Sequence, residues 1–164
     1  MRTVTRSVLF VSASLAALAF SARAAAVDIT ACGQTFENMA TLIGDLDCSG
    51  FAGPAIEGSG TLDLAGHVLT AGDDVAFRCT KGRCTVVSTG VSAEIVGAAS
   101  SPKVCIRANE GTRLEVSDVT VRRCSTAIAG DRITLANTTL TDTDIGLFSS
   151  AAAVFGISRV DIHD

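Results

Sequence analysis

The chain has 164 residues with 13 basic and 17 acidic side chains, so its formal net charge is −4 at pH 7. An acidic surface repels phosphate backbones, and the only local basic cluster, Arg122–Arg123, follows acidic residues closely, which argues against nucleic-acid binding. The chain lacks Trp and Tyr, so it has few aromatic platforms for sugars. The phenylalanines after residue 24 fall mostly at strand positions expected in the core: Phe36, Phe51, Phe77, Phe148 and Phe155.

An apolar run from Val8 to Phe20 follows Arg2 and Arg6 and ends in small residues. A helix needs about 20 apolar residues to cross a bilayer, and this run is shorter, so the pattern predicts a cleaved export signal rather than an anchor. We expect the signal to cover residues 1–24, with cleavage near residues 24–26, and no transmembrane anchor in the mature chain. The mature protein is therefore predicted to be secreted, as an extracellular, cell-surface or periplasmic protein.

Residues 27–40 are mixed polar and carry Cys32. A solenoid needs a polar cap at each open end to prevent edge pairing, so this segment is predicted to be an N-terminal cap. The strand pattern begins with residues 41–48, continues through a Gly-rich turn, and returns as a short apolar strand at residues 55–56. Residues 41–164 are accordingly predicted to form one β-solenoid domain.

A repeated rung with its inward residues at offsets 0, +2, +5 and +7 runs through this domain. The extra residue at offset +4 is predicted to be a corner where the strand turns. The last three copies lie 19 and 22 residues apart, a period typical of stacked solenoid coils. The rungs and their corner residues are Leu62 with Gly66, Leu114 with Asp118, Ile133 with Asn137, and Phe155 with Arg159.

The middle coil fits the same offsets less cleanly, with Cys84, Val86, Thr89 and Val91 as predicted inward residues. A longer excursion at residues 97–103 follows, and loops of this kind are where solenoids build binding surfaces. A short return strand follows each corner, which predicts a second face of every coil. These return strands are residues 75–77, 104–106, 127–128 and 145–147.

All six cysteines follow the export signal, so they enter an oxidising compartment and are predicted to form disulfides. A zinc site is disfavoured because the chain has no Cys-x-x-Cys motif. Cysteines one coil apart would stand ~4.8 Å from each other, within the Cα separation of about 4.4 to 6.8 Å that a disulfide accepts. The predicted bridges are Cys32–Cys48 from cap to first coil, Cys79–Cys84 across a tight loop, and Cys105–Cys124 between stacked coils.

The segments Gly44–Gly50 and Gly60–His67, with the repeated short rungs, resemble the right-handed parallel β-helix proteins of the pectin lyase-like superfamily. The resemblance covers roughly residues 40 to 162 and lies in the coil pattern. It implies an all-β, right-handed parallel β-helix of about five to six coils, with three parallel sheets around a narrow core. Many members of this superfamily are enzymes that act on acidic polysaccharides. The resemblance therefore also implies this activity, which depends on particular residues rather than on the coil pattern.

Asp73 and Asp74 lie in a segment similar to the Gly-Asp-Asp segment of the polygalacturonase branch. There, one carboxyl protonates the leaving oxygen and another activates water. The Asn-Thr-Asp and Gly-His-Gly segments of that branch are missing from this chain. We therefore interpret Asp73 and Asp74 as a polar corner before a return strand, and keep them as the catalytic candidates under the enzyme alternative.

The pectate lyase branch gathers acidic residues around calcium and uses an Arg or Lys to take a proton from a sugar carbon. The calcium candidates here are Asp118, Asp142 and Asp144, with Arg122 or Arg123 one coil away as the base. The aromatic-Ile-Asp-His motif of that branch is missing, and alternating Thr and Asp is also typical of a soluble surface strand. Calcium is expected only under this alternative, and no other cofactor is expected.

The sequence ends at Asp164, directly after a rung and without an obvious cap. An open coil leaves unpaired strand groups, which predicts either self-association through this coil or a shortened form of a longer β-helix. The predicted function is a secreted, non-catalytic structural or binding module at or outside the cell surface, with carbohydrate or a second copy as partner. The alternative is a lyase or hydrolase acting on acidic, pectin-like polysaccharide.

Overall fold

The computed structural model describes residues 25–98, 104–149 and 154–163, and the regular secondary structure of these residues is β-strand throughout. β-branched residues at period two suit a pleated, half-buried surface. The strands are β1 (Val27–Ile29), β2 (Gln34–Leu42), β3 (Leu46–Asp47), β4 (Ile56–Asp63), β5 (Val68–Thr70), β6 (Phe77–Val87), β7 (Ala93–Val96), β8 (Val104–Ala108), β9 (Arg113–Ser117), β10 (Val119–Ala129), β11 (Arg132–Phe148) and β12 (Val154–His163).

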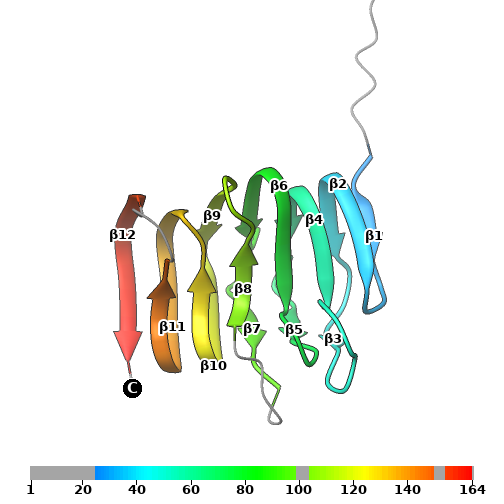
Figure 1. Ribbon diagram of the computed structural model, residues 1–164. Helices are drawn as coiled ribbons and strands as arrows, with labels where there is room; N and C mark the ends of the chain where they lie inside the picture. The colour runs from blue at the N-terminus through cyan, green and yellow to red at the C-terminus, as the bar shows by residue number, and fades with distance from the viewer. Residues whose placement is uncertain (1–24, 99–103, 150–153, 164) are drawn as a thin grey trace, which may run out of the picture.

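The chain winds into a parallel β-solenoid of about five turns, as the sequence predicts. Figure 1 shows the coils following one another from β1 to β12. The long strands bend at a corner, so that each contributes to two faces of the solenoid. The strand pairings therefore divide into three sheets. Sheet 1 aligns Gln34, Ile56, Phe77, Ile106, Ile128 and Leu147; sheet 2 aligns Ala40, Leu62, Val86, Val116, Leu135 and Ile157; sheet 3 aligns Leu46, Leu69, Ile95, Val121, Leu140 and Ile162.

The predicted return strands form sheet 1, where they align coil upon coil. The predicted rungs form sheets 2 and 3. In the copies that begin at Leu114 and Ile133, all four inward residues are buried, which confirms the offsets. The one polar member, Thr138, keeps its hydroxyl within hydrogen-bond distance of the carbonyl oxygens of Val116 (3.2 Å) and Ala136 (3.0 Å).

The predicted corner residues all adopt the left-handed backbone conformation. Their φ angles are +83° at Gly66, +59° at Asp118, +48° at Asn137 and +51° at Arg159. This conformation turns the strand between sheets 2 and 3 without breaking the ladder, and Gly, Asn and Asp tolerate it best. The Asn137 Nδ2 group also donates a hydrogen bond to Asp118 Oδ1 at 3.1 Å, which links two neighbouring corners.

The prediction for the middle rung, which begins at Cys84, is wrong for its last two inward residues. Thr89 is exposed and Val91 is 69% exposed, whereas Ala93 and Ile95 point into the core. The reason is a longer turn between sheets 2 and 3, in which Ser88 Oγ donates to the Val91 carbonyl oxygen at 2.6 Å. The same hydroxyl accepts a hydrogen bond from the Gly66 N–H at 3.0 Å, so the enlarged turn is anchored to the corner before it.

At the N-terminal end, residues 27–40, the predicted cap, contain β1 and most of β2. Parallel pairing with the next coil begins at Gln34, opposite Ile56, which is earlier than residue 41. β1 pairs with residues 40–42 of β2 and forms the first edge. The predicted export signal, residues 1–24, and residues 99–103 of the predicted excursion lie outside the described residues.

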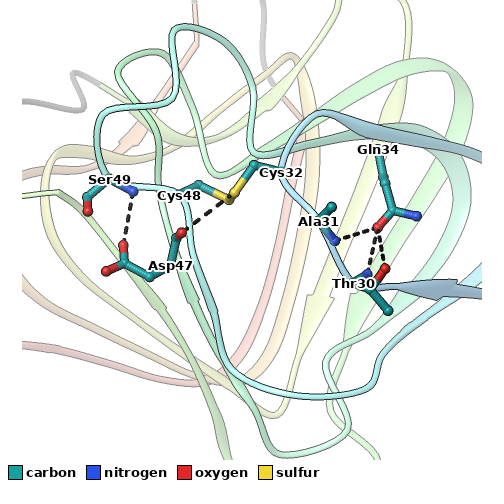
Figure 2. Close-up of a disulfide and its surroundings, with 7 residues drawn as sticks. All are labelled: Thr30, Ala31, Cys32, Gln34, Asp47, Cys48 and Ser49. Carbon is teal, nitrogen blue, oxygen red and sulfur yellow. Dashed lines mark hydrogen bonds between the residues drawn. A yellow bond between two sulfur atoms is a disulfide. The ribbon is translucent and has the colours of Figure 1, made fainter.

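The three predicted disulfide pairs are present, with Cα separations of 5.7 Å for Cys32–Cys48, 5.9 Å for Cys79–Cys84 and 5.8 Å for Cys105–Cys124. Figure 2 shows the first of them between the turn after β1 and the end of β3. Beside it, Gln34 Oε1 accepts hydrogen bonds from the N–H groups of Thr30 (2.6 Å) and Ala31 (2.7 Å).

The stacking argument for the third bridge is wrong, although the pair is right. The register of β8 on β10 aligns Val104 with Thr126 and Ile106 with Ile128, so Cys105 lies beside Ala127. The register partner of Cys124 is Thr143, in the following coil. The Cys105–Cys124 bridge therefore crosses diagonally between coils near a corner of the solenoid.

Candidate functional site

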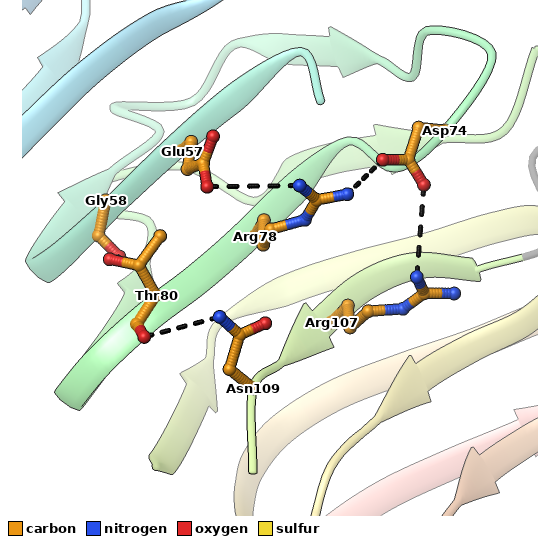
Figure 3. Close-up of polar contacts among 7 residues, drawn as sticks. All are labelled: Glu57, Gly58, Asp74, Arg78, Thr80, Arg107 and Asn109. Atoms are coloured by element: carbon orange, nitrogen blue, oxygen red, sulfur yellow. Dashed lines mark hydrogen bonds and ion pairs between the residues drawn. The ribbon is translucent and has the colours of Figure 1, made fainter. Parts of the chain in front are cut away.

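The outer face of sheet 1 carries a row of charged side chains that crosses three coils. Glu57, Arg78 and Arg107 are aligned by the strand register. Arg78 lies 3.9 Å from Glu57 and also pairs with Asp74, whose second oxygen lies 4.0 Å from Arg107 (Figure 3). We call Glu57, Arg78, Asp74 and Arg107 the charge ladder. Because one carboxylate joins two guanidinium groups, the ladder ties adjacent coils together on their solvent side.

Hydrogen bonds to backbone carbonyls flank the charge ladder. Thr80 Oγ1 donates to the Gly58 carbonyl oxygen at 3.2 Å, and Asn109 Nδ2 donates to the Thr80 carbonyl oxygen at 3.3 Å (Figure 3). These bonds fix the loop between Cys79 and Cys84 against the coils on both sides. The outer face of sheet 1 thus carries several paired polar groups around the charge ladder.

The catalytic candidates Asp73 and Asp74 have different surroundings. Asp73 is exposed, and its backbone N–H donates to the Phe51 carbonyl oxygen at 2.9 Å. Asp74 is half-buried and committed to Arg78 and Arg107. The segment thus forms a polar corner before the sheet 1 strand, in which one carboxylate has a cross-coil structural contact.

The calcium candidates occupy two different corners. Asp118 is at the corner between sheets 2 and 3, whereas Asp142 is at the corner that follows sheet 3, with φ of +52°. The strand from Asn137, the neighbour of Asp118, to Asp142 spans about 16 Å. Asp144 is exposed two residues further on. Within residues 25–98, 104–149 and 154–163, no group of three or more His, Cys, Asp or Glu is placed to hold a metal ion.

The candidate base Arg122 is held by Glu94 in the preceding coil. Its Nη2 and Nε atoms donate to Glu94 Oε2 at 2.7 and 2.9 Å, on the outer face of sheet 3. Arg123 is exposed at the corner with φ of +57°, and the register places it opposite Asp142. The structure therefore brings Arg123 next to one calcium candidate, but leaves Arg122 in an ion pair away from Asp118.

A hollow of about 720 Å³ opens along sheet 1, at the Arg107 end of the charge ladder. It is lined by two register rows, Val104–Thr126–Ile145 and Arg107–Ala129–Phe148, together with residues of the adjoining turns. We refer to this site as the hollow. Its remaining lining residues are Ala108, Glu110, Ser125, Gly130 and Asp131.

The walls of the hollow are more apolar than the face before it. Ile145 is 44% exposed and Phe148 is 50% exposed, so large apolar groups meet solvent there. Val104 and Ala129 form its floor, and with Val75 they make up a small apolar cluster separate from the main core. The expectation that Phe148 lies in the core is therefore wrong, because Phe148 is one residue past the inward Leu147 and faces outward.

The sequence reading missed the hollow and also a column of arginines. Arg83, Arg113 and Arg132 are aligned in adjacent coils at the start of the sheet 2 strands, although 30 and 19 residues separate them. Arg83 pairs with Glu115, which offsets part of this charge. The hollow could have been predicted from the residues that follow the return strands. Each of them faces outward and lies beside the equivalent residues of the adjacent coils.

Comparison of the chain with protein-family models, curated proteins and solved structures finds no match. The class that the fold defines is therefore the parallel β-solenoid, without a narrower family. In the described residues, no helix has the length and apolar character needed to span a membrane.

Proposed function

We propose that this protein is a non-catalytic β-solenoid module that works outside the cytosol and binds a ligand in the hollow. The observation that carries the proposal is the exposure of Ile145 and Phe148 in a concave site whose floor is already apolar. Concave, mostly apolar sites with a few polar groups are the usual form of ligand sites, and exposed apolar surface on a soluble protein often marks an interaction site.

The surroundings of the catalytic candidates favour a binding role. Asp74 and Arg122 are both held in ion pairs with neighbouring coils, where they join strands. Asp118 and Asp142 belong to different corners. The resemblance to pectin lyase-like proteins lies in the coil pattern, and a fold of this kind is compatible with many functions.

Three disulfides support a location outside the cytosol. The cytosol keeps thiols reduced, whereas secreted and periplasmic proteins retain such bridges. Cys79, Cys84 and Cys105 are fully buried, which is typical of structural disulfides rather than of exchanging ones. The apolar run before the described residues fits the same compartment, as an export signal.

The binding role is tested by screening the oxidised protein against immobilised oligosaccharides and short peptides. Phe148→Ala is the site variant, and Val91→Ala is its control, because Val91 is an exposed apolar residue in the turn between sheets 2 and 3. We expect at least one ligand class to bind the wild-type protein and the control, and to be lost by Phe148→Ala. If Phe148→Ala binds the same ligands as the wild-type protein, or if no ligand binds the wild-type protein, the proposal is contradicted.

The enzyme alternative is tested on the same preparation with polygalacturonate, with and without calcium. Release of reducing or unsaturated ends that disappears in Asp73→Asn or Asp142→Asn would establish catalysis and contradict the non-catalytic role. We expect no release from the wild-type protein under either condition.

Self-association through the last coil is a second candidate role, favoured by one observation. In the described part of the chain, β12 pairs only with β11, and its residues Ile157 and Ile162 are 56% and 59% exposed. A strand edge beside exposed apolar groups is a template for a second chain. Sedimentation over a range of concentrations should show a reversible dimer, weakened by Ile157→Ser; a monomer at all concentrations would contradict this role.

A further inference from the structure

We propose that the ligand of the hollow is a cationic peptide segment whose aromatic side chain inserts between Arg107 and Phe148, above Ala129. The inference rests on the proposed function, because it names the ligand class of the same site. Three features of the hollow carry it: a gap in one row of side chains, an apolar floor, and acidic groups at the rim.

The gap follows from the register. Arg107, Ala129 and Phe148 stand in one row on three successive strands, so the outer two are about 9.6 Å apart at their Cα atoms. The middle residue ends at its Cβ atom, whereas both neighbours have long planar groups. A planar ring placed above Ala129 would therefore meet the phenyl ring of Phe148 on one side and the side chain of Arg107, whose guanidinium lies near Asp74, on the other. Both contacts are favourable for an aromatic ring.

The floor explains why the inserted group is apolar. Ala129 and Val104 are each 8% exposed, and together with Val75 they form the apolar cluster below the gap. Ile145, three residues before Phe148 on the same strand, adds exposed apolar surface to the same hollow. A hydroxyl or charged group placed directly on Ala129 and Val104 would lose water against side chains that offer no hydrogen-bonding atom, whereas an aromatic ring would not.

The rim explains why the ligand is cationic. Glu110 and Asp131 line the hollow, and neither forms an ion pair among the described residues. The Ser149 hydroxyl donates a hydrogen bond to Asp131 at 3.4 Å, which adds no positive charge. Arg107 is shared with Asp74, so it balances little of the rim. Lys or Arg beside the aromatic residue would complement these carboxylates, whereas neutral or acidic sugars would not.

The test uses blocked synthetic peptides and calorimetric titration of the wild-type protein. The probe is acetyl-Gly-Lys-Phe-Lys-Gly-amide, and the comparison peptides replace both Lys by Glu or replace Phe by Ala. We expect the probe to bind at least tenfold more tightly than either comparison peptide. The preference over the Glu peptide should weaken as salt rises, since the rim charges are solvent-exposed.

Variants separate the contributions of the gap and the rim. Ala129→Leu fills the gap and Phe148→Ala removes one wall, and each should weaken the probe about tenfold. Glu110→Gln with Asp131→Asn should abolish the salt dependence. Glu37→Gln is the charge control, because Glu37 is an exposed carboxylate bound to Lys81 far from the hollow. Unchanged circular dichroism and melting temperature check the fold of each variant.

The outcomes distinguish this inference from the proposed function. If the Glu peptide binds as well as the probe, or if both Ala129→Leu and Phe148→Ala bind the probe normally, the cationic peptide is excluded. An oligosaccharide that binds the wild-type protein but not Phe148→Ala, with no peptide binding, would overturn this inference and leave the binding module standing. If no ligand of either class depends on Phe148, both fail.

Discussion

The coils before β9 and the coils after it are held together by different means. Before β9 the register offset between coils changes: Gly58 pairs with Cys79 and Gly60 with Cys84, while Phe77 pairs with Ile106. After β9 the offset does not change within a pair of strands: β11 follows β9 and β10 at 19 residues throughout, and β12 follows β11 at 22 residues throughout. Among the described residues, the Cys105–Cys124 bridge and the ion pairs between coils all lie before β11.

This difference shows what a regular repeat contributes. Where every coil has the same length, backbone pairing and the inward rows set the register without further cross-links. Where a loop of four residues is inserted between Cys79 and Cys84, the ladder is interrupted and a side-chain bond closes the gap. Side-chain cross-links therefore accompany irregular coils, and their removal should affect the early coils most.

The largest effect is expected for the bridge that follows the excursion at residues 97–103. Replacing Cys105 and Cys124 by Ala should lower the free energy of unfolding by about 3 kcal/mol, because the bridge constrains a long loop in the unfolded chain. Urea denaturation measures this loss. The matched pair is Cys79→Ala with Cys84→Ala, whose shorter loop predicts about 2 kcal/mol. A larger loss for the shorter loop would contradict this ranking.

Gly60 should be the next most sensitive position, because it lies where the register shifts. Its φ is +98°, and a Cβ atom there would overlap the carbonyl group of Asn38. Gly60→Ala should therefore cost about 2 to 3 kcal/mol through strain and displaced backbone. Gly82→Ala is the control, since Gly82 has φ of +66° but open space around it. There, thermal denaturation should show only about 1 kcal/mol.

The corner at Asn137 tests the regular coils, with a smaller expected effect. Asn137→Ala should cost about 1 kcal/mol, because Ala is disfavoured in the left-handed region and cannot bond to Asp118. Asn137→Gly removes the same hydrogen bond but accepts the backbone angle, so it should retain most of the stability. If Gly were as destabilising as Ala, the hydrogen bond rather than the corner geometry would hold these coils.

The smallest effect is a pH dependence in the early coils. Partial burial tends to raise the pKa of Asp63, but hydrogen bonds from the Thr89 hydroxyl and from the N–H groups of Ala65 and Thr89 hold it below its usual value of 3.8. A lowered pKa in the folded state stabilises the fold above pH 3.8, and this contribution is lost as pH falls through the lower folded value.

Asp63→Asn should remove this part of the acid sensitivity. Comparing its urea midpoint with that of the wild-type protein at pH 7 and at pH 3 should show a larger loss for the wild-type protein on acidification. The difference should remain below about 1 kcal/mol, because the carboxylate is partly solvated. Equal losses in both proteins would mean that Asp63 does not contribute.

The regular and the irregular coils also differ in how well the sequence predicts them. The rungs at Leu114 and Ile133 are confirmed because one strict spacing repeats and their corner residues tolerate a left-handed backbone. The middle rung fails because Thr89 and Val91 fit the offsets by residue type, while the turn there is longer. The spacing of residue types does not predict the length of a turn, because a polar residue in a turn cannot be distinguished by sequence from a polar residue that faces outward on a strand.

The site was harder to predict than the fold. Asp73 and Asp74 drew attention as a local motif, yet the role of Asp74 depends on Arg78 and Arg107, which only the register brings to it. The hollow depends on Ala129 standing between two long side chains in other coils. Both features depend on side chains that face outward. The periodicity from which the fold is predicted constrains only the side chains that face the core.

The diagonal bridge between Cys105 and Cys124 also determines how the protein would respond to a pulling force. In a parallel solenoid the hydrogen bonds between coils run along the axis, so tension on the two ends peels coils off one at a time. No cysteine follows Cys124, so β11 and β12 could unwind freely from the C-terminal side. The 17 residues of β11 alone would release about 6 nm of chain before the bridge halted the process.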